Sequence, residues 1–247
     1  MDRLMNKTSV MTVAALCAAC LALPALAAPR VPEAAGQNYL VAAQDPSPFH
    51  FGAFYRNHDR TINLDNGGQL TFNTDRCGGF LAYDIFDFFA VYGMAAYTWN
   101  GLDEFGDKKD NSTIWGFGAW INLFDTELID GLALENRFRL DANFQFLTGD
   151  CDVYSEEMSY TELYGSLTAS IVNEIVGNKT MWPEAIGVFF GPTFCSWDSD
   201  DFETKYDDMG FGVGLDIYLT RRAILSAAYE VYEKGENATG ITMGVRF

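Results

Sequence analysis

Hydrophobic and polar or small residues alternate one by one along most of the chain after residue 48. The alternation is clearest over residues 209–220. Its apolar positions are Met209, Phe211, Val213, Leu215, Ile217 and Leu219. A period of two is the period of a β-strand, because successive side chains of a strand point to opposite faces. The pattern therefore predicts an all-β protein.

Ten segments carry this pattern with differing clarity, and turn-forming residues separate them. The predicted strands are 49–56, 80–86, 88–99, 115–123, 134–146, 163–171, 186–197, 209–220, 223–233 and 241–247. The connection 58–79 contains Asn66-Gly67 between apolar positions, which predicts an additional hairpin that stands beyond the other strands. An even number of strands returns both ends of the chain to the same side.

One face of these strands is apolar, whereas the other is dominated by Gly, Ala and Ser with isolated charges. A soluble β-sandwich or a lipocalin-like barrel is the competing fold, but its polar face would be solvated rather than small. In hydrocarbon every backbone polar group needs a partner, so a sheet must close on itself. We therefore predict a closed antiparallel transmembrane β-barrel over residues 49–247. It has ten strands, with eight as the alternative, and both termini are periplasmic.

The N-terminal region predicts export. Residues 1–27 have a positively charged start, an uncharged apolar core over 10–23, and the small-x-small cleavage pattern Ala25-Leu26-Ala27. Residues 28–48 are rich in Ala and Pro and are predicted to be a flexible lead-in. No later stretch has the roughly 20 apolar residues that a spanning helix requires. We expect a cleaved signal peptide and no helical anchor.

The last strand alternates up to the final residue, with Ile241, Met243, Val245 and Phe247 on one face. Together with the signal peptide and the alternating strands, this ending resembles small bacterial outer-membrane β-barrel proteins. The resemblance covers about residues 49–247 and identifies no subfamily. It implies a place in the outer membrane of a Gram-negative-type envelope, in contact with lipid and lipopolysaccharide. It also implies that Phe247 is an assembly signal, read by the barrel-assembly machinery.

Charged residues fall on the inward face of the predicted strands. They are Arg56, Asp84, Glu135, Arg137, Arg139, Asp141, Glu162, Asp216, Glu230 and Arg246. Mixed charges inside a narrow barrel are expected to pair, because an isolated buried charge is costly; for Arg246 the expected partner is Glu230 or Asp216. Two functions fit this lumen: a structural or surface protein with an ion-paired plug, or a narrow porin-like channel for ions or small solutes.

The formal net charge of −18 argues against nucleic acid as a partner. Acidic residues gather in the predicted long connections, which leaves a third function open, that of an adhesin or host-interaction protein. One group is a candidate for binding a divalent cation such as calcium or magnesium: Asp198, Asp200, Asp201 and Glu203. It matches a calcium loop only loosely. No other cofactor is expected, and the sequence leaves the oligomeric state open.

Three cysteines follow the predicted signal peptide: Cys77, Cys151 and Cys195. Each falls near the loop end of the predicted barrel, and export permits a disulfide among them. The odd number leaves at least one thiol over, and the sequence does not select the pair.

The two histidines give little support for an enzyme. His50 is expected to point inward at the periplasmic start of the first strand, whereas the barrel hydrolases of this class carry their histidine near the outer rim. His58 is followed by Asp59, but adjacent residues on a strand point to opposite faces, so Asp59 cannot orient His58. We expect no enzymatic activity and expect His58 to be a surface residue.

Overall fold

The computed structural model describes residues 48–63, 69–102, 110–129, 135–153, 156–174, 183–199, 204–220 and 222–246. These residues form ten β-strands, and no helix occurs among them. The strands are β1 (Phe49–Asn63), β2 (Gln69–Phe86), β3 (Phe89–Leu102), β4 (Asp110–Ile129), β5 (Glu135–Val153), β6 (Glu156–Glu174), β7 (Ala185–Ser199), β8 (Thr204–Thr220), β9 (Ala223–Tyr232) and β10 (Asn237–Arg246).

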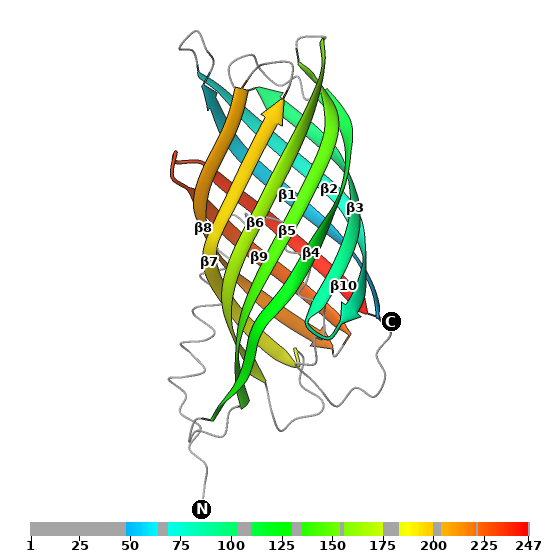
Figure 1. Cartoon of the computed structure of the whole chain (residues 1–247), viewed down its shortest axis with the longest axis vertical. Coiled ribbons are helices and arrows are strands. Elements are labelled where there is room, and N and C mark those ends of the chain that lie inside the picture. The colour runs from blue at the N-terminus through cyan, green and yellow to red at the C-terminus, as the bar shows by residue number, and fades with distance from the viewer. Residues whose placement is uncertain are drawn as a thin grey trace, which may run out of the picture.

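The strands close into a single barrel in which each strand pairs antiparallel with its neighbour in the chain. Closure is made by β1 and β10, whose register runs from His50 opposite Arg246 to Asp59 opposite Asn237. Figure 1 shows the tilted strands wrapped around one cylinder. The prediction of a closed ten-stranded barrel is confirmed, and the eight-stranded alternative is wrong. Within the described part of the chain, no helix is long and apolar enough to span a membrane.

Several strands are longer than the sequence pattern predicted. The pairing of β1 with β2 continues to Asn63 opposite Gln69, so the predicted connection 58–79 is largely paired strand. The connections between the predicted strands 88–99 and 115–123, between 134–146 and 163–171, and between 186–197 and 209–220 are likewise shortened by strand extensions. The expectation of long loops at these places is wrong, because a strand whose two faces are both polar lacks the apolar markers that a period-two search needs.

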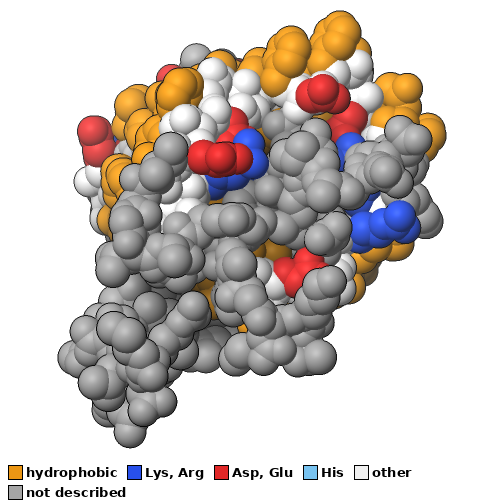
Figure 2. All heavy atoms as spheres, turned by 90° about the horizontal axis from the view of Figure 1, so that it is seen from below, with side chains coloured by type: hydrophobic (Ala, Val, Ile, Leu, Met, Phe, Trp, Pro, Cys, Tyr) orange, Lys and Arg blue, Asp and Glu red, His pale blue; other side chains and the backbone are white. Residues whose placement is uncertain are grey.

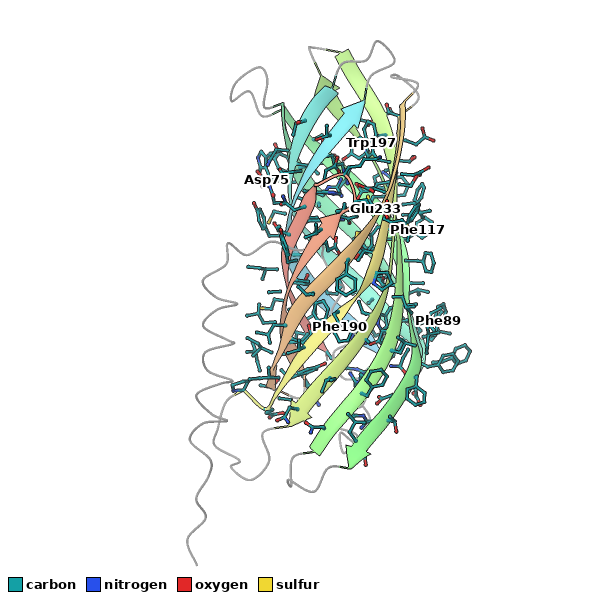
Figure 3. The ribbon with its side chains drawn as sticks, turned by 90° about the vertical axis from the view of Figure 1, so that its left-hand side faces the viewer. Asp75, Phe89, Phe117, Phe190, Trp197 and Glu233 are labelled. Carbon is teal, nitrogen blue, oxygen red and sulfur yellow. The ribbon has the colours of Figure 1, made fainter. Side chains whose placement is uncertain are left out.

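The outward face carries a broad apolar band. Phe117, Leu81 and Phe144 are 59%, 57% and 56% exposed, and many other large apolar side chains are exposed with them. Figure 3 shows Phe117 and Phe89 pointing away from the wall. In water an apolar surface of this extent would be a liability, whereas the hydrocarbon of a bilayer matches it. The barrel is therefore a transmembrane barrel.

The band ends on β1 and β2 at Tyr55, whose hydroxyl donates a hydrogen bond to Asp75 at 2.5 Å. Beyond it the outward side chains are polar and bonded to each other: Asn57 donates to Asp75 at 3.0 Å, and Asn73 donates to Asp59 at 2.5 Å. Asp75 lies toward the end of the barrel opposite the termini (Figure 3). These strands thus extend beyond the apolar band, on the side away from the termini.

The inward side chains fill the barrel. Apolar side chains from different strands, including Phe54, Phe80, Leu147 and Phe189, are at most 6% exposed. Glycines make room for the larger rings: a Cβ atom on Gly118 would lie 2.2 Å from the Tyr92 ring, and one on Gly214 would lie 2.2 Å from the Phe189 ring. These side chains are therefore packed as closely as those of a protein core.

Three predicted features lie outside the described residues. They are the signal peptide over 1–27, nearly all of the lead-in over 28–48, and the terminal Phe247. They remain predictions.

A charge placed in the middle of the apolar band should destabilise the barrel according to its depth. We expect Phe117→Arg to lower the free energy of unfolding from phospholipid vesicles by about 2–4 kcal/mol, because the guanidinium would face hydrocarbon. The matched control is Thr61→Arg, at a half-buried position on the polar extension of β1, where the loss should be about 0–1 kcal/mol. Equal losses in urea titrations of the two variants would contradict this position of the band.

Candidate functional site

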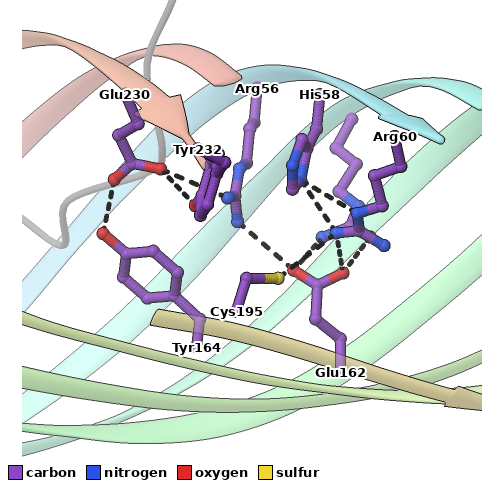
Figure 4. Close-up of polar contacts among 9 residues, drawn as sticks. Arg56, His58, Arg60, Glu162, Tyr164, Cys195, Glu230 and Tyr232 are labelled. Carbon is purple, nitrogen blue, oxygen red and sulfur yellow. Dashed lines mark hydrogen bonds and ion pairs between the residues drawn. The ribbon is translucent and has the colours of Figure 1, made fainter. Parts of the chain in front are cut away.

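The most concentrated group of charges in the lumen is centred on Glu162 of β6. Three arginines converge on its carboxylate across the lumen, two from β1 and one from β2 (Figure 4). Oε1 accepts from Arg56 Nη1 at 3.3 Å and from Arg76 Nη1 at 3.0 Å, and Oε2 accepts from Arg60 Nη2 at 2.5 Å and Arg76 Nη2 at 2.6 Å. All four side chains are at most 3% exposed.

A second carboxylate, Glu230 of β9, completes the group. Its two oxygens accept hydrogen bonds from the hydroxyls of Tyr164 at 2.5 Å and Tyr232 at 2.8 Å. Arg56 Nη2 lies 3.5 Å from Glu230, and the Arg56 guanidinium sits 5.1 Å from the centre of the Tyr164 ring. Arg56 therefore links both glutamates, with a cation–π contact in addition. We call Arg56, Arg60, Arg76, Glu162 and Glu230 the lumen cluster.

His58 and Cys195 adjoin the lumen cluster. The Nδ1 atom of His58 accepts from Arg60 Nε at 3.1 Å, and the imidazole stacks on Tyr232 with ring centres 5.3 Å apart. Arg60 Nη2 also lies 3.8 Å from the Cys195 sulfur. His58 is 1% exposed and Cys195 is fully buried. The expectation that His58 is a surface residue is wrong, since the inward alternation from Arg56 continues through His58 to Arg60.

One ligand set in this group has the spacing of a metal site. His58, Glu162 and Cys195 each offer a donor atom, and these atoms lie within 4.8 Å of one another. Both oxygens of Glu162, however, already accept hydrogen bonds from arginines. A cation placed here would also face three guanidinium groups, which Coulomb repulsion strongly disfavours. The set therefore does not fit a metal cation.

A separate set of charges lies at the end of the barrel that holds the termini. His50 Nε2 lies 2.8 Å from Asp84 Oδ2, and Arg246 donates to the same carboxylate. The expected partner of Arg246 was Glu230 or Asp216, and that expectation is wrong. The pairing of β1 with β10 places Arg246 beside His50, and thus beside Asp84 of β2. Figure 2 views the molecule from this end and shows hydrophobic side chains along its upper rim, with positively and negatively charged side chains among the visible residues.

The remaining predicted lumen charges are dispersed. Arg137 and Arg139 of β5 both approach Asp125 of β4, at 2.7 and 3.3 Å. Asp141 accepts from Asn122 at 2.8 Å, and Asp216 accepts from Ser226 at 2.6 Å. Of the ten predicted lumen charges, only three belong to the lumen cluster: Arg56, Glu162 and Glu230. The Glu135 side chain lies outside the described residues.

The candidate cation loop is only partly described. Asp198 is exposed on β7, whereas Asp200, Asp201 and Glu203 lie outside the described residues. The cysteines are separated by the barrel wall: Cys77 is exposed on the outward face, Cys195 is buried in the lumen, and both thiols are free. Every pair among the three cysteines includes Cys77 or Cys195, so the disulfide that export permits is not formed. The side chain of Cys151 is not among those described.

Sequence reasoning missed Arg60, Arg76, Tyr164 and Tyr232 as partners of the predicted charges. Arg60 and Arg76 fall within the segment predicted to be a connection. A continued count in steps of two from Arg56 would have reached Arg60, and a count back from Phe80 would have reached Arg76. The meeting of β1, β2 and β6 across the lumen has no local signal in the sequence.

No protein-family model matches the chain, and no curated protein sequence is significantly similar to it. Solved structures with a similar course of the chain include the translocator domain of autotransporter NalP from Neisseria meningitidis (10% identity, 83% of this chain and 90% of that chain, TM-score 0.42). An outer membrane channel from Pseudomonas putida F1 matches with 10% identity over 83% of this chain and 97% of that chain, with a TM-score of 0.37. Neisserial surface protein A matches with 9% identity over 83% of this chain and 100% of that chain, with a TM-score of 0.36. These likenesses are too distant to transfer any of their functions.

Removing the charge of Glu162 should leave three arginines without their shared counter-charge. We expect Glu162→Gln, which keeps the shape of the side chain, to lower the free energy of unfolding by about 3–5 kcal/mol. Urea titration of the barrel in phospholipid vesicles measures the change. Glu233→Gln, at an exposed position beyond β9, is the matched control and should be nearly neutral. An unchanged midpoint for Glu162→Gln would contradict the central place of this carboxylate.

Proposed function

We propose that this protein is a bacterial outer-membrane β-barrel with a structural or surface role, whose lumen is closed by paired charges. The observation that carries the proposal is the lumen cluster, in which three arginines share one carboxylate and all four side chains are at most 3% exposed. Exposure this low leaves no room for water beside these groups. The buried apolar side chains elsewhere in the lumen support the same conclusion.

The closed lumen favours this role over the narrow porin-like channel. A channel lined by charges needs groups that contact water and can exchange partners with a passing ion. In the lumen cluster, both oxygens of Glu162 are held by arginines, and both oxygens of Glu230 are held by tyrosine hydroxyls. A solute would have to displace several charge-assisted hydrogen bonds at once.

A surface role is supported by the strands that extend beyond the apolar band. Asn57, Asp59, Asn73 and Asp75 form a polar, hydrogen-bonded strip on the outward face of β1 and β2, at the end away from the termini. With periplasmic termini, this end would face the outside of the cell.

Adhesion through the acidic connections is the second candidate function. Lipopolysaccharide and a divalent cation are candidate partners there, and the barrel-assembly machinery is the proposed reader of Phe247.

We propose no enzymatic role. Asp59 follows His58 in the chain but accepts a hydrogen bond from Asn73 on the outward face, so it does not orient the His58 imidazole. The Nδ1 atom of His58 is held by Arg60, and His50 pairs with Asp84 near the termini. Neither histidine is placed to activate a nucleophile in the manner of a hydrolase triad.

The closed lumen predicts an electrically silent protein. After refolding and insertion into a planar bilayer, the wild-type barrel should give no steady stepwise currents in potassium chloride, because the lumen cluster excludes water and ions. A porin added to the same bilayer afterwards provides the positive control. Steady, charge-selective steps from the wild-type protein would contradict the proposal and favour the narrow channel.

The proposed orientation predicts which turns can be labelled from outside the cell. In a background without the native cysteines, Lys234→Cys in the β9–β10 turn should react with a membrane-impermeant maleimide on intact cells. Asp87→Cys in the β2–β3 turn should react only after the outer membrane is permeabilised. Both positions are exposed, so accessibility of the thiol itself is matched. The reverse labelling pattern would show that the barrel is inserted with extracellular termini.

A further inference from the structure

The backbone ladder between β6 and β7 is interrupted in the middle of the wall. Pairing stops after Ser166 opposite Thr193 and resumes at Ala169 opposite Phe190. The register is the same on both sides of the gap, so neither strand has an inserted residue. The other irregularities among the described ladders are register shifts, which occur between β2 and β3, β4 and β5, and β8 and β9. The gap between β6 and β7 is therefore of a different kind.

Pro192 is the cause of the gap. In the continued register it lies opposite Leu167, but proline has no N–H to donate. Its pairing with Phe211 of β8, on the other side, is intact. The missing donor therefore belongs to the ladder with β6. Proline is confined almost entirely to edge strands and bulges for this reason, and a closed barrel has no edge strand.

The carbonyl oxygen of Leu167 is the group that loses its partner. A Cβ atom on Gly191 would collide with this oxygen, so the carbonyl points toward β7 and lies against the Gly191 backbone. The side chains of Leu167 and Pro192 are both exposed on the outward face, where Phe190 and Phe211 belong to the apolar band. Hydrocarbon supplies no hydrogen-bond donor in place of the missing one. The ladder is therefore weakened at this point.

The lumen side does not replace the missing bond. Gly191 and Thr193 are the inward residues of β7 on either side of Pro192. Glycine has no side chain, and Thr193 Oγ1 has no hydrogen-bond partner in the described part of the chain, although the residue is only 3% exposed. The nearest polar contact of β7 across the lumen is at Cys195, which Arg60 of the lumen cluster approaches at 3.8 Å.

We propose that the wall opens reversibly between β6 and β7, at Leu167 and Pro192, while the rest of the barrel stays closed. Local opening occurs where the fewest interactions must be broken, and one ladder hydrogen bond is already absent here. The pairing of β1 with β10 and the ion pairs of the lumen cluster do not involve these two residues. The opening connects the lumen beside Thr193 with the hydrocarbon, so a lumen that is closed along its axis still has a lateral route.

Hydrogen exchange of single backbone amides tests the opening, because neighbouring residues of β6 face different ladders. Like its carbonyl, the N–H of Leu167 faces β7, and so does the N–H of Ala169. The N–H groups of Ser166 and Thr168 face β5, across a continuous ladder. NMR follows the exchange in refolded, isotope-labelled protein in phospholipid bicelles after transfer to deuterated water. We expect the first two amides to exchange at least about tenfold faster than the other two.

Pro192→Ala restores the missing donor. We expect this variant to lose the difference between the two pairs of amides, because its N–H can bond the carbonyl of Leu167 and complete the ladder. Val188→Ala is the matched control, since it lies on the lipid-facing side of the same strand, loses the same number of carbon atoms and adds no donor. It should keep the wild-type difference. Pro192→Val restores the N–H with an apolar side chain and should repeat the effect of Pro192→Ala, whichever of the two variants refolds better.

Equal exchange of the four amides in the wild-type protein would overturn the proposal. A difference that persists after Pro192 has been replaced would do the same, because the missing donor would then not be its cause. The amides of Leu163 and Ile171 also face β7, on either side of the gap, and should stay as protected as those that face β5. Fast exchange of these two amides would show that the whole of β7 separates, which contradicts a local opening.

Discussion

The pairing of β1 with β10 is the interaction on which the rest of the structure depends. It turns a meander of neighbouring strands into a sheet without an edge, with His50 opposite Arg246 at one end of the seam and Asp59 opposite Asn237 at the other. In hydrocarbon an unpaired strand edge would expose several backbone donors and acceptors that lipid cannot satisfy. Only after this seam has formed can the outward face remain apolar and the inward face become an enclosed lumen.

Closure creates a second requirement, because the polar and charged side chains that it encloses must find their hydrogen-bond and ion-pair partners among one another. The lumen meets it in two ways. Apolar side chains such as Phe54 and Leu147 are buried, and they carry no polar groups that require hydrogen-bond partners. Charged side chains are gathered where partners from several strands meet. Glu162 receives arginines from β1 and β2, while Arg56 also reaches Glu230 on β9. A single missing carboxylate would leave buried charge uncompensated, so these groups have to be present together.

Much of the fold could be predicted from the sequence because alternation is a local property. The strand over 209–220 was predictable from its own residues, and so was the inward orientation of Arg139, Asp141 and Glu162, which the structure finds almost fully buried. The prediction failed for the extension of β1 and β2, where outward residues such as Asn57 and Asp75 are polar and the contrast between faces disappears. It also failed for the partner of Arg246, because that pairing depends on the seam and not on any neighbouring residue.

The lumen cluster ties the closure of the lumen to the stability of the wall. Burying the outward face in lipid does little to hold the strands together, because that face is in an apolar medium whether or not they pack. Cohesion must come from the backbone ladder and from contacts across the lumen. Arginine suits such contacts, since its long side chain spans part of the lumen and its guanidinium binds a carboxylate at two points, as Arg76 does with Glu162. The side chains that join β1 and β2 to β6 are therefore the same ones that exclude water, and a variant that opened the lumen at this level would also lose contacts that hold the barrel together.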